Sequence, residues 1–202
     1  NWRNVYLSLL PGAKSWLLGV HSKNISGKLT VPLMPSAVWQ GKFDYIYFPK
    51  EKKKKYVASK QAKSALNLKA LKASQLPSLD LSVKDFRYGA LDINKIHLVK
   101  QKTKKAYVIK SWQSQSPIFG LRFSGQWGAG VTNVKGNFKS TNLGKLLKQL
   151  GETKTLADGR ANVNFSLAWP GSPMQMSLAK STGYIGMLVE RGRFLKIGSK
   201  AQ

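Results

Sequence analysis

The sequence contains no cysteine, which excludes a disulfide framework, a cysteine-based zinc site and a thiol nucleophile. Histidine is scarce too, and His21 and His97 lie too far apart in the sequence to suggest a metal centre. The 8 acidic residues show no paired spacing typical of glycoside hydrolysis, and no serine-hydrolase, zinc-protease or P-loop motif occurs. The residues therefore offer no catalytic site, and we expect a protein that is not an enzyme and uses no cofactor.

Long apolar runs are also missing. The longest uncharged stretch, residues 161–179, is broken by polar residues and two prolines, whereas a spanning helix needs about 20 mostly apolar residues. The chain has 202 residues, of which 42% are hydrophobic, and this is enough for one domain with a core. Because it begins with Asn1 rather than Met, we expect residues 1–202 to be one incomplete segment of a longer protein.

Negative charge is sparse, so positive charge dominates: 34 Lys and Arg face 8 Asp and Glu, for a net charge of +26. Only 6 of these cations are Arg, the residue favoured for bidentate phosphate recognition, so a nucleic-acid-binding role ranks last among the interpretations. Two lysine-rich runs, residues 50–55 and 100–105, favour loops attracted to an anionic membrane surface, and an ordinary solvated surface explains them equally well. The predicted headgroup contacts are Lys52, Lys53, Lys54, Lys55, Lys102, Lys104 and Lys105.

The chain does contain strand after strand with apolar residues at every other position. Val163 and Phe165 alternate with polar residues, and the pattern recurs in residues 79–83, 174–178 and 185–189. Successive side chains on a strand point to opposite faces, so these segments predict a sheet with one continuous apolar face. Either a second sheet or a molecule that is not protein covers such a face, and the alternation alone does not decide between them.

Turn residues divide the rest of the chain. Residues 16–20, 25–31 and 43–47 predict strands, and residues 50–75 predict a basic, mobile excursion. From residue 76 onward, turn signals recur at intervals that suit an antiparallel meander.

One segment, residues 141–150, predicts a short amphipathic helix instead. Its leucines at 143, 146, 147 and 150 have the spacing of one helix face. Ser140 or Thr141 is placed to cap its first turn, and Gly151 is placed to end it. We expect this helix to lie on the sheet and close one end of it.

The order of several sequence blocks carries further information. Residues 76–81, 86–89 and 121–127 are followed by the helix at residues 141–147 and by Phe165–Pro173, which contains a Trp-Pro-Gly-Ser-Pro turn. This arrangement resembles the AsmA-like, YhdP-type envelope proteins of Gram-negative bacteria. The similarity extends over about residues 16–195 and is weakest over residues 40–75.

The resemblance implies a mainly β fold, in which a long curved antiparallel meander forms an open hydrophobic groove. It also implies a periplasmic segment of an inner-membrane-anchored protein that carries phospholipid toward the outer membrane. An envelope scaffold that binds protein partners through its apolar face is the alternative. The residues expected to line the groove are Leu79, Leu81, Val83, Val163, Phe165, Leu167, Trp169, Met174, Met176, Leu178, Ile185, Met187 and Val189.

Overall fold

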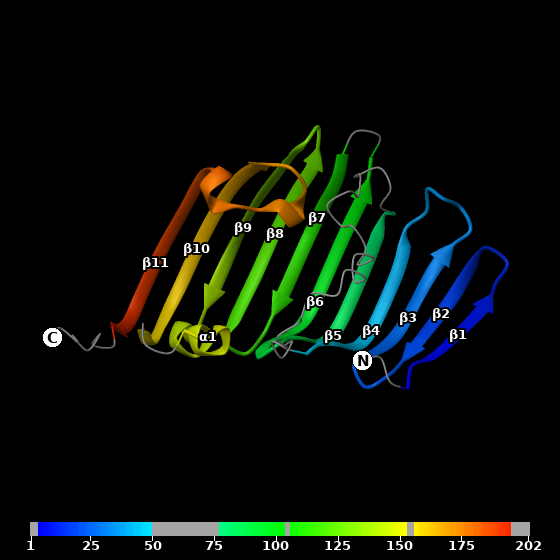
Figure 1. Cartoon of the computed structure of the whole chain (residues 1–202), viewed down its shortest axis with the longest axis horizontal. Helices are drawn as coiled ribbons and strands as arrows, with labels where there is room; N and C mark the ends of the chain where they lie inside the picture. Colours follow the sequence, from blue (N-terminus) through cyan, green and yellow to red (C-terminus); the bar gives the residue numbers. More distant parts are fainter. Residues whose placement is uncertain (1–3, 50–76, 104–105, 153–155, 195–202) are drawn as a thin grey trace, which may run out of the picture.

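The computed structural model describes residues 4–49, 77–103, 106–152 and 156–194, which form one open β-sheet with one short α-helix (Figure 1). The sheet has 11 strands, and their order in the sheet is their order in the sequence. The predicted mainly β fold is therefore confirmed. The strands are β1 (Tyr6–Pro11), β2 (Ser15–His21), β3 (Ile25–Pro32), β4 (Trp39–Phe48), β5 (Leu79–Tyr88), β6 (Leu91–Lys102), β7 (Ala106–Gln115), β8 (Phe119–Gly128), β9 (Val131–Ser140), β10 (Leu156–Pro170) and β11 (Thr182–Phe194).

Neighbouring strands pair antiparallel at every position but one: β4 and β5 run parallel. The prediction of an antiparallel meander is wrong at this pair. Two parallel strands need a crossover of a dozen or more residues, and the long stretch between Phe48 and Leu79 supplies it. The predicted excursion, residues 50–75, belongs to this stretch and lies outside the described residues.

Two further elements differ from the prediction. β1 was not expected, because Leu9 and Leu10 break the alternation; both are more than half exposed on this edge strand. Residues 174–178 form no strand but belong to a segment with two 3₁₀ turns, η3 (Pro173–Gln175) and η4 (Leu178–Lys180). Pro173 has no N–H for a strand ladder, and the Gln175 side chain accepts a 2.8 Å hydrogen bond from the backbone N–H of Ser172, which favours the turn.

The predicted helix is α1 (Leu143–Leu150), and Asn142 caps it rather than Ser140 or Thr141. The Asn142 side chain accepts a 2.8 Å hydrogen bond from the backbone N–H of Lys145, whereas the Ser140 hydroxyl donates to the Ile118 carbonyl. Gly151 ends the helix with a φ of 100°, a left-handed conformation that glycine adopts without strain. α1 packs on β10 and also touches β6, so it lies at one end of the sheet as expected (Figure 1).

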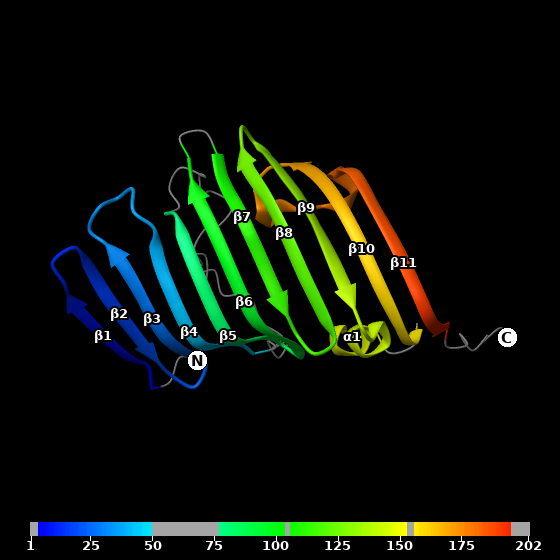
Figure 2. The same cartoon turned by 180° about the vertical axis from the view of Figure 1, so that it is seen from behind.

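The two faces of the sheet differ in what covers them. The segment that carries η3 and η4 lies in front of the sheet in Figure 1 and behind it in Figure 2, so it belongs to one face only. Buried apolar side chains gather on this face in the middle strands, where Val83, Ile96, Leu98 and Tyr107 are at most 7% exposed. We call this surface, whose residues are defined below, the apolar face.

Candidate functional site

One uninterrupted row of residues crosses the apolar face from the first strand to the last. Residues paired across neighbouring strands point to the same face of a sheet, so the register identifies the members of the row. Every member is apolar or glycine, and no polar side chain interrupts it. The row comprises Leu9, Leu18, Leu29, Gly41, Leu81, Leu98, Trp112, Phe123, Gly136, Phe165 and Ile185.

Close packing between large side chains holds the centre of the row together. The rings of Trp112 and Phe123 are stacked with their centroids 5.5 Å apart. Gly136 has a steric role here, because a Cβ atom would lie 2.7 Å from Cζ of Phe165 and 2.6 Å from Cβ of Phe123. The missing side chain therefore leaves room for both aromatic rings.

The predicted lining residues of β5, β10 and β11 lie on this face. Val163 pairs with Met187, Phe165 with Ile185, and Val189 with Ala161, so the β10 and β11 residues are direct neighbours. The predicted β5 residues lie across the sheet and join them only through the strands between. The residues concerned are Leu79, Leu81, Val83, Val163, Phe165, Leu167, Trp169, Ile185, Met187 and Val189.

The other predicted lining residues, Met174, Met176 and Leu178, lie in the η3–η4 segment at one end of the sheet. Met176 is 51% exposed and Leu178 is 67% exposed. Of the predicted headgroup lysines, Lys102 ends β6, and the others lie outside the described residues. The role of all these residues toward lipid stays a prediction.

Sequence reasoning missed several members of the apolar face. β-Bulges explain some of the omissions, because a bulge shifts the alternation by one residue. In β5 a register shift places both Val83 and Phe86 on the apolar face, although they are three residues apart. In β7 a similar shift places both Ile109 and Trp112 on it. The regular alternation of residues 119–127 was a signal that could have identified Phe123 and its neighbours.

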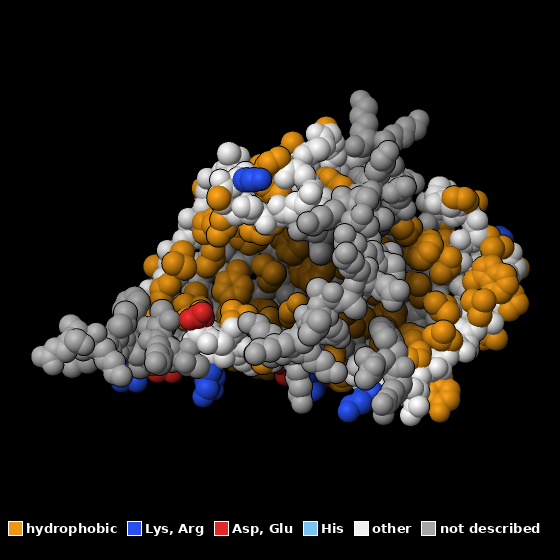
Figure 3. Space-filling view, viewed as in Figure 1, with side chains coloured by type: hydrophobic (Ala, Val, Ile, Leu, Met, Phe, Trp, Pro, Cys, Tyr) orange, Lys and Arg blue, Asp and Glu red, His pale blue; other side chains and the backbone are white. Residues whose placement is uncertain are grey.

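Helix α1 and the η3–η4 segment border the apolar face at its opposite ends. At one end Leu146 of α1 is 6% exposed, and Gly144 brings the helix against the β10 backbone near Leu156 and Asp158. At the other end the hydroxyl of Thr132 donates a 2.8 Å hydrogen bond to the carbonyl of Gly171 and fixes the η3–η4 segment. Between them, Figure 3 shows a hollow that is dominated by hydrophobic side chains.

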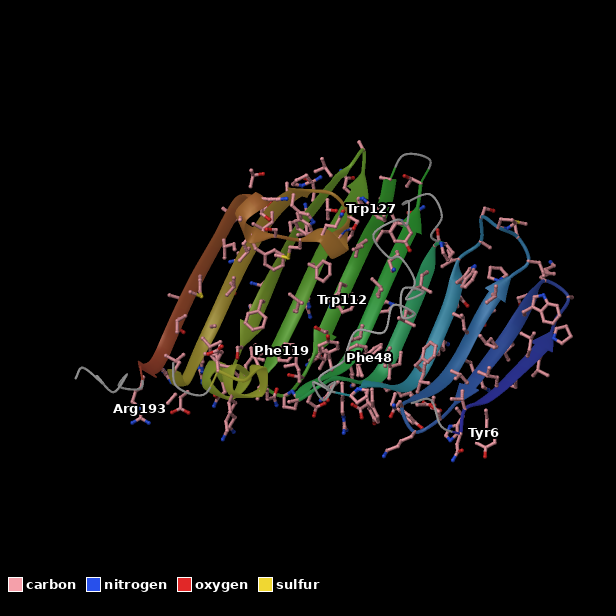
Figure 4. The ribbon with its side chains drawn as sticks, in the orientation of Figure 1. Tyr6, Phe48, Trp112, Phe119, Trp127 and Arg193 are labelled. Atoms are coloured by element: carbon pink, nitrogen blue, oxygen red, sulfur yellow. The ribbon has the colours of Figure 1, made fainter. Side chains whose placement is uncertain are left out.

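Aromatic side chains mark the apolar face from one end to the other. Figure 4 shows Trp127 near the end that η3 and η4 border, Trp112 in the middle, and Phe119 and Phe48 toward the end with α1. Phe119 is buried and faces Phe138, with 6.0 Å between the ring centroids. The face thus presents aromatic rings along the full length of the strands.

The opposite face is polar and carries the charge. Asn137 donates hydrogen bonds to the side chains of Asn162 and Asn164 at 2.7 and 2.8 Å. Lys84 forms a 2.8 Å ion pair with Asp44, and this contact lowers the pKa of the Asp44 carboxyl. An open depression of about 890 Å³ on this face is lined by Lys84, Lys95, His97, Gln113, Arg122 and Lys139, among others.

Two ionisable groups of the apolar face have shifted pKa values. Burial raises the pKa of Tyr107 to about 12, and the Tyr107 hydroxyl donates a 2.9 Å hydrogen bond to the carbonyl of Pro77. Burial lowers the pKa of Lys100, whose ammonium nitrogen lies 5.1 Å from the centroid of the Tyr107 ring. Both shifts have the direction expected when apolar surroundings penalise the charged form.

Comparison with known proteins adds the family. Neither the curated proteins nor the solved structures gave a match to the chain. Among the described residues, no helix is both long and apolar enough to cross a bilayer. The sequence model of one protein family, described as YhdP protein, matches residues 1–202, so the resemblance noted in the sequence is confirmed. The chain belongs to the YhdP family.

Proposed function

We propose that this chain is a segment of a bridge that carries phospholipid between the inner and outer membranes of a Gram-negative bacterium, with the acyl chains lying on the apolar face. The YhdP family is a non-enzymatic, envelope-associated family, which supports a role of this kind in the periplasm. The observation that carries the proposal is the uninterrupted apolar row across 11 strands. An acyl chain needs a long apolar surface and no hydrogen-bond partner.

Two buried hydroxyls of the apolar face favour lipid over a protein partner. Thr132 and Ser140 lie on this face, and each donates its hydroxyl hydrogen to a backbone carbonyl, at 2.8 and 2.9 Å. A protein interface uses about one hydrogen bond per 100–200 Å², so a protein partner would need free donors and acceptors here. Internal use of these hydroxyls suits acyl chains better.

Exposure of apolar side chains on the two edge strands, β1 and β11, also supports the proposal. Ile185 and Met187 on β11 are 55% and 68% exposed, and Leu7 and Leu9 on β1 are 68% and 58% exposed. Soluble monomers rarely expose clusters of large apolar side chains unless these bind something. We infer that the apolar face is a path along the sheet and not a closed pocket.

Site-specific photocrosslinking tests the proposal. A photoreactive residue at Phe165, on the apolar face, should label phospholipid in cells, whereas one at the exposed Asn164 on the opposite face should not. The two positions are adjacent in sequence, so they share the same local concentration of lipid. Equal labelling at both positions would contradict the proposal, and labelling of protein alone at Phe165 would favour the scaffold alternative.

A further inference from the structure

One charged residue, Lys100, lies on the otherwise apolar face. Lys100 pairs with Leu79 on β5 and with Ile109 on β7, and it follows Leu98 of the apolar row by two positions. Side chains two residues apart on a strand point to the same side. Lys100 therefore extends from the apolar face, unlike Lys84 and Lys95, which line the depression on the polar face.

The ammonium group of Lys100 has no carboxylate partner among the residues that the structure describes. Its nitrogen lies 5.1 Å from the centroid of the Tyr107 ring, and its side chain is partly buried. A charge that leaves water without a counter-ion is unfavourable unless something else stabilises it. An ionisable residue that is partly buried in apolar surroundings is a candidate functional residue.

A second unpaired donor lies on the next row of the same face. Trp112 pairs with Leu98, and its indole N–H is buried with no hydrogen-bond partner among the described residues. Native structures rarely leave buried donors unsatisfied. Lys100 and Trp112 lie on adjacent rows and each offers a hydrogen-bond donor, and an oxyanion accepts from donors of both kinds.

The surroundings of Lys100 suit the polar end of a lipid. Tyr107, Trp127, Thr132 and Trp169 form the register row near the end that the η3–η4 segment borders. Aromatic residues with one polar atom are typical of the boundary between apolar chains and polar headgroups. Trp112 lies farther toward the middle of the strands than Trp127 (Figure 4), so acyl chains have apolar rows to occupy beyond Lys100.

We propose that Lys100, assisted by the indole N–H of Trp112, binds the phosphodiester of a phospholipid whose acyl chains lie on the apolar face. This inference rests on the proposed function and adds to it the position of the headgroup. The ammonium donates charge-assisted hydrogen bonds to the phosphate oxygens, and the phosphate supplies the missing negative charge. Lys100 thereby selects lipids that carry a phosphate over neutral lipids with the same chains.

The experiment compares two lipids that differ only in the headgroup. The purified chain is incubated with mixed micelles of dioleoyl phosphatidylglycerol and dioleoylglycerol, and native mass spectrometry measures the ratio of the two bound lipids. The variants are Lys100→Met, Lys100→Arg and Trp112→Phe, and Lys95→Met on the polar face is the matched control. Glycerophosphate is added as a competitor without acyl chains.

We expect the wild type to prefer phosphatidylglycerol, and Lys100→Met to lower that preference by about tenfold or more. Lys100→Arg and Lys95→Met should keep the preference, and Trp112→Phe should lower it less than Lys100→Met does. Glycerophosphate should not displace the phospholipid, because it lacks the acyl chains.

Other results separate the two proposals. If the wild type and Lys100→Met bind both lipids in the same ratio, the Lys100 site is wrong and the lipid path stands. If neither lipid is bound by the wild type, the proposed function itself fails. Displacement of phospholipid by glycerophosphate alone would show a site for free phosphate and overturn the headgroup assignment.

Discussion

Leu146 anchors α1, and its replacement by alanine gives the sharpest test of how this helix is held. Leu146 is 6% exposed, whereas Leu150 on the same helix is 59% exposed. Burying a leucine side chain contributes about 1.5–3 kcal/mol, and the cavity left by truncation adds to the loss. We therefore expect Leu146→Ala to lower the free energy of unfolding by about 2–5 kcal/mol, and Leu150→Ala to lower it by less than about 1 kcal/mol.

Urea unfolding measures this difference. With an m-value of about 1–3 kcal/mol/M, the Leu146→Ala midpoint should fall by about 1 M or more, and the Leu150→Ala midpoint should change little. Amide exchange in residues 143–150 serves as a second readout, since an undocked helix exchanges faster even if the sheet stays folded. Equal midpoints for both variants, with unchanged amide exchange, would refute the docking of α1 through Leu146.

Two further predictions follow from the same structure. Gly144→Ala should stabilise the helix in an isolated peptide by about 1 kcal/mol but destabilise the whole chain. In the folded chain a Cβ at this position would lie 2.5 Å from the backbone nitrogen of Asp158 and 2.9 Å from the carbonyl oxygen of Leu156. Circular dichroism of the peptide and urea unfolding of the chain measure the two effects, and stabilisation in both would contradict the prediction. The pKa of Tyr107 is raised to about 12 by burial, so the stability that this neutral phenol contributes is fully present below about pH 10 and is lost as the pH rises toward 12. Wild type should therefore lose its stability advantage over Tyr107→Phe between about pH 10 and pH 12, and a constant difference across that range would show that Tyr107 ionises as freely in the folded state as in the unfolded chain.

The local elements could be read from the sequence because local rules govern them. Alternation at Val163, Phe165 and Leu167 assigned these side chains to one face, and the structure confirms that they share it. The leucine spacing and Gly151 located α1 to within two residues. The cap was misassigned because the hydroxyls of Ser140 and Thr141 bond to carbonyls near Ile118, far away in the sequence.

The candidate site could be predicted only in part, because bulges and non-local pairing decide the remainder. The alternation stops at the bulges, so Phe86 and Trp112 could not be assigned to the apolar face from their spacing. Lys100 was read as the start of a basic loop, although it belongs to β6 and lies on the apolar face. Lys100 has apolar surroundings because strand pairing places Leu79 and Ile109 beside it, and the sequence alone does not show this pairing.

The sequence by itself determined that this protein is a sheet with one apolar and one polar face, a short helix and a specific turn, and it carried the resemblance to the YhdP family. These properties follow from side-chain periodicity and local backbone preferences, which act over a few residues. The tertiary structure alone decided the parallel pairing of β4 with β5, and it alone joined the apolar row across 11 strands. The register is defined only when neighbouring strands pair, so the row across the sheet exists only once all the strands have paired.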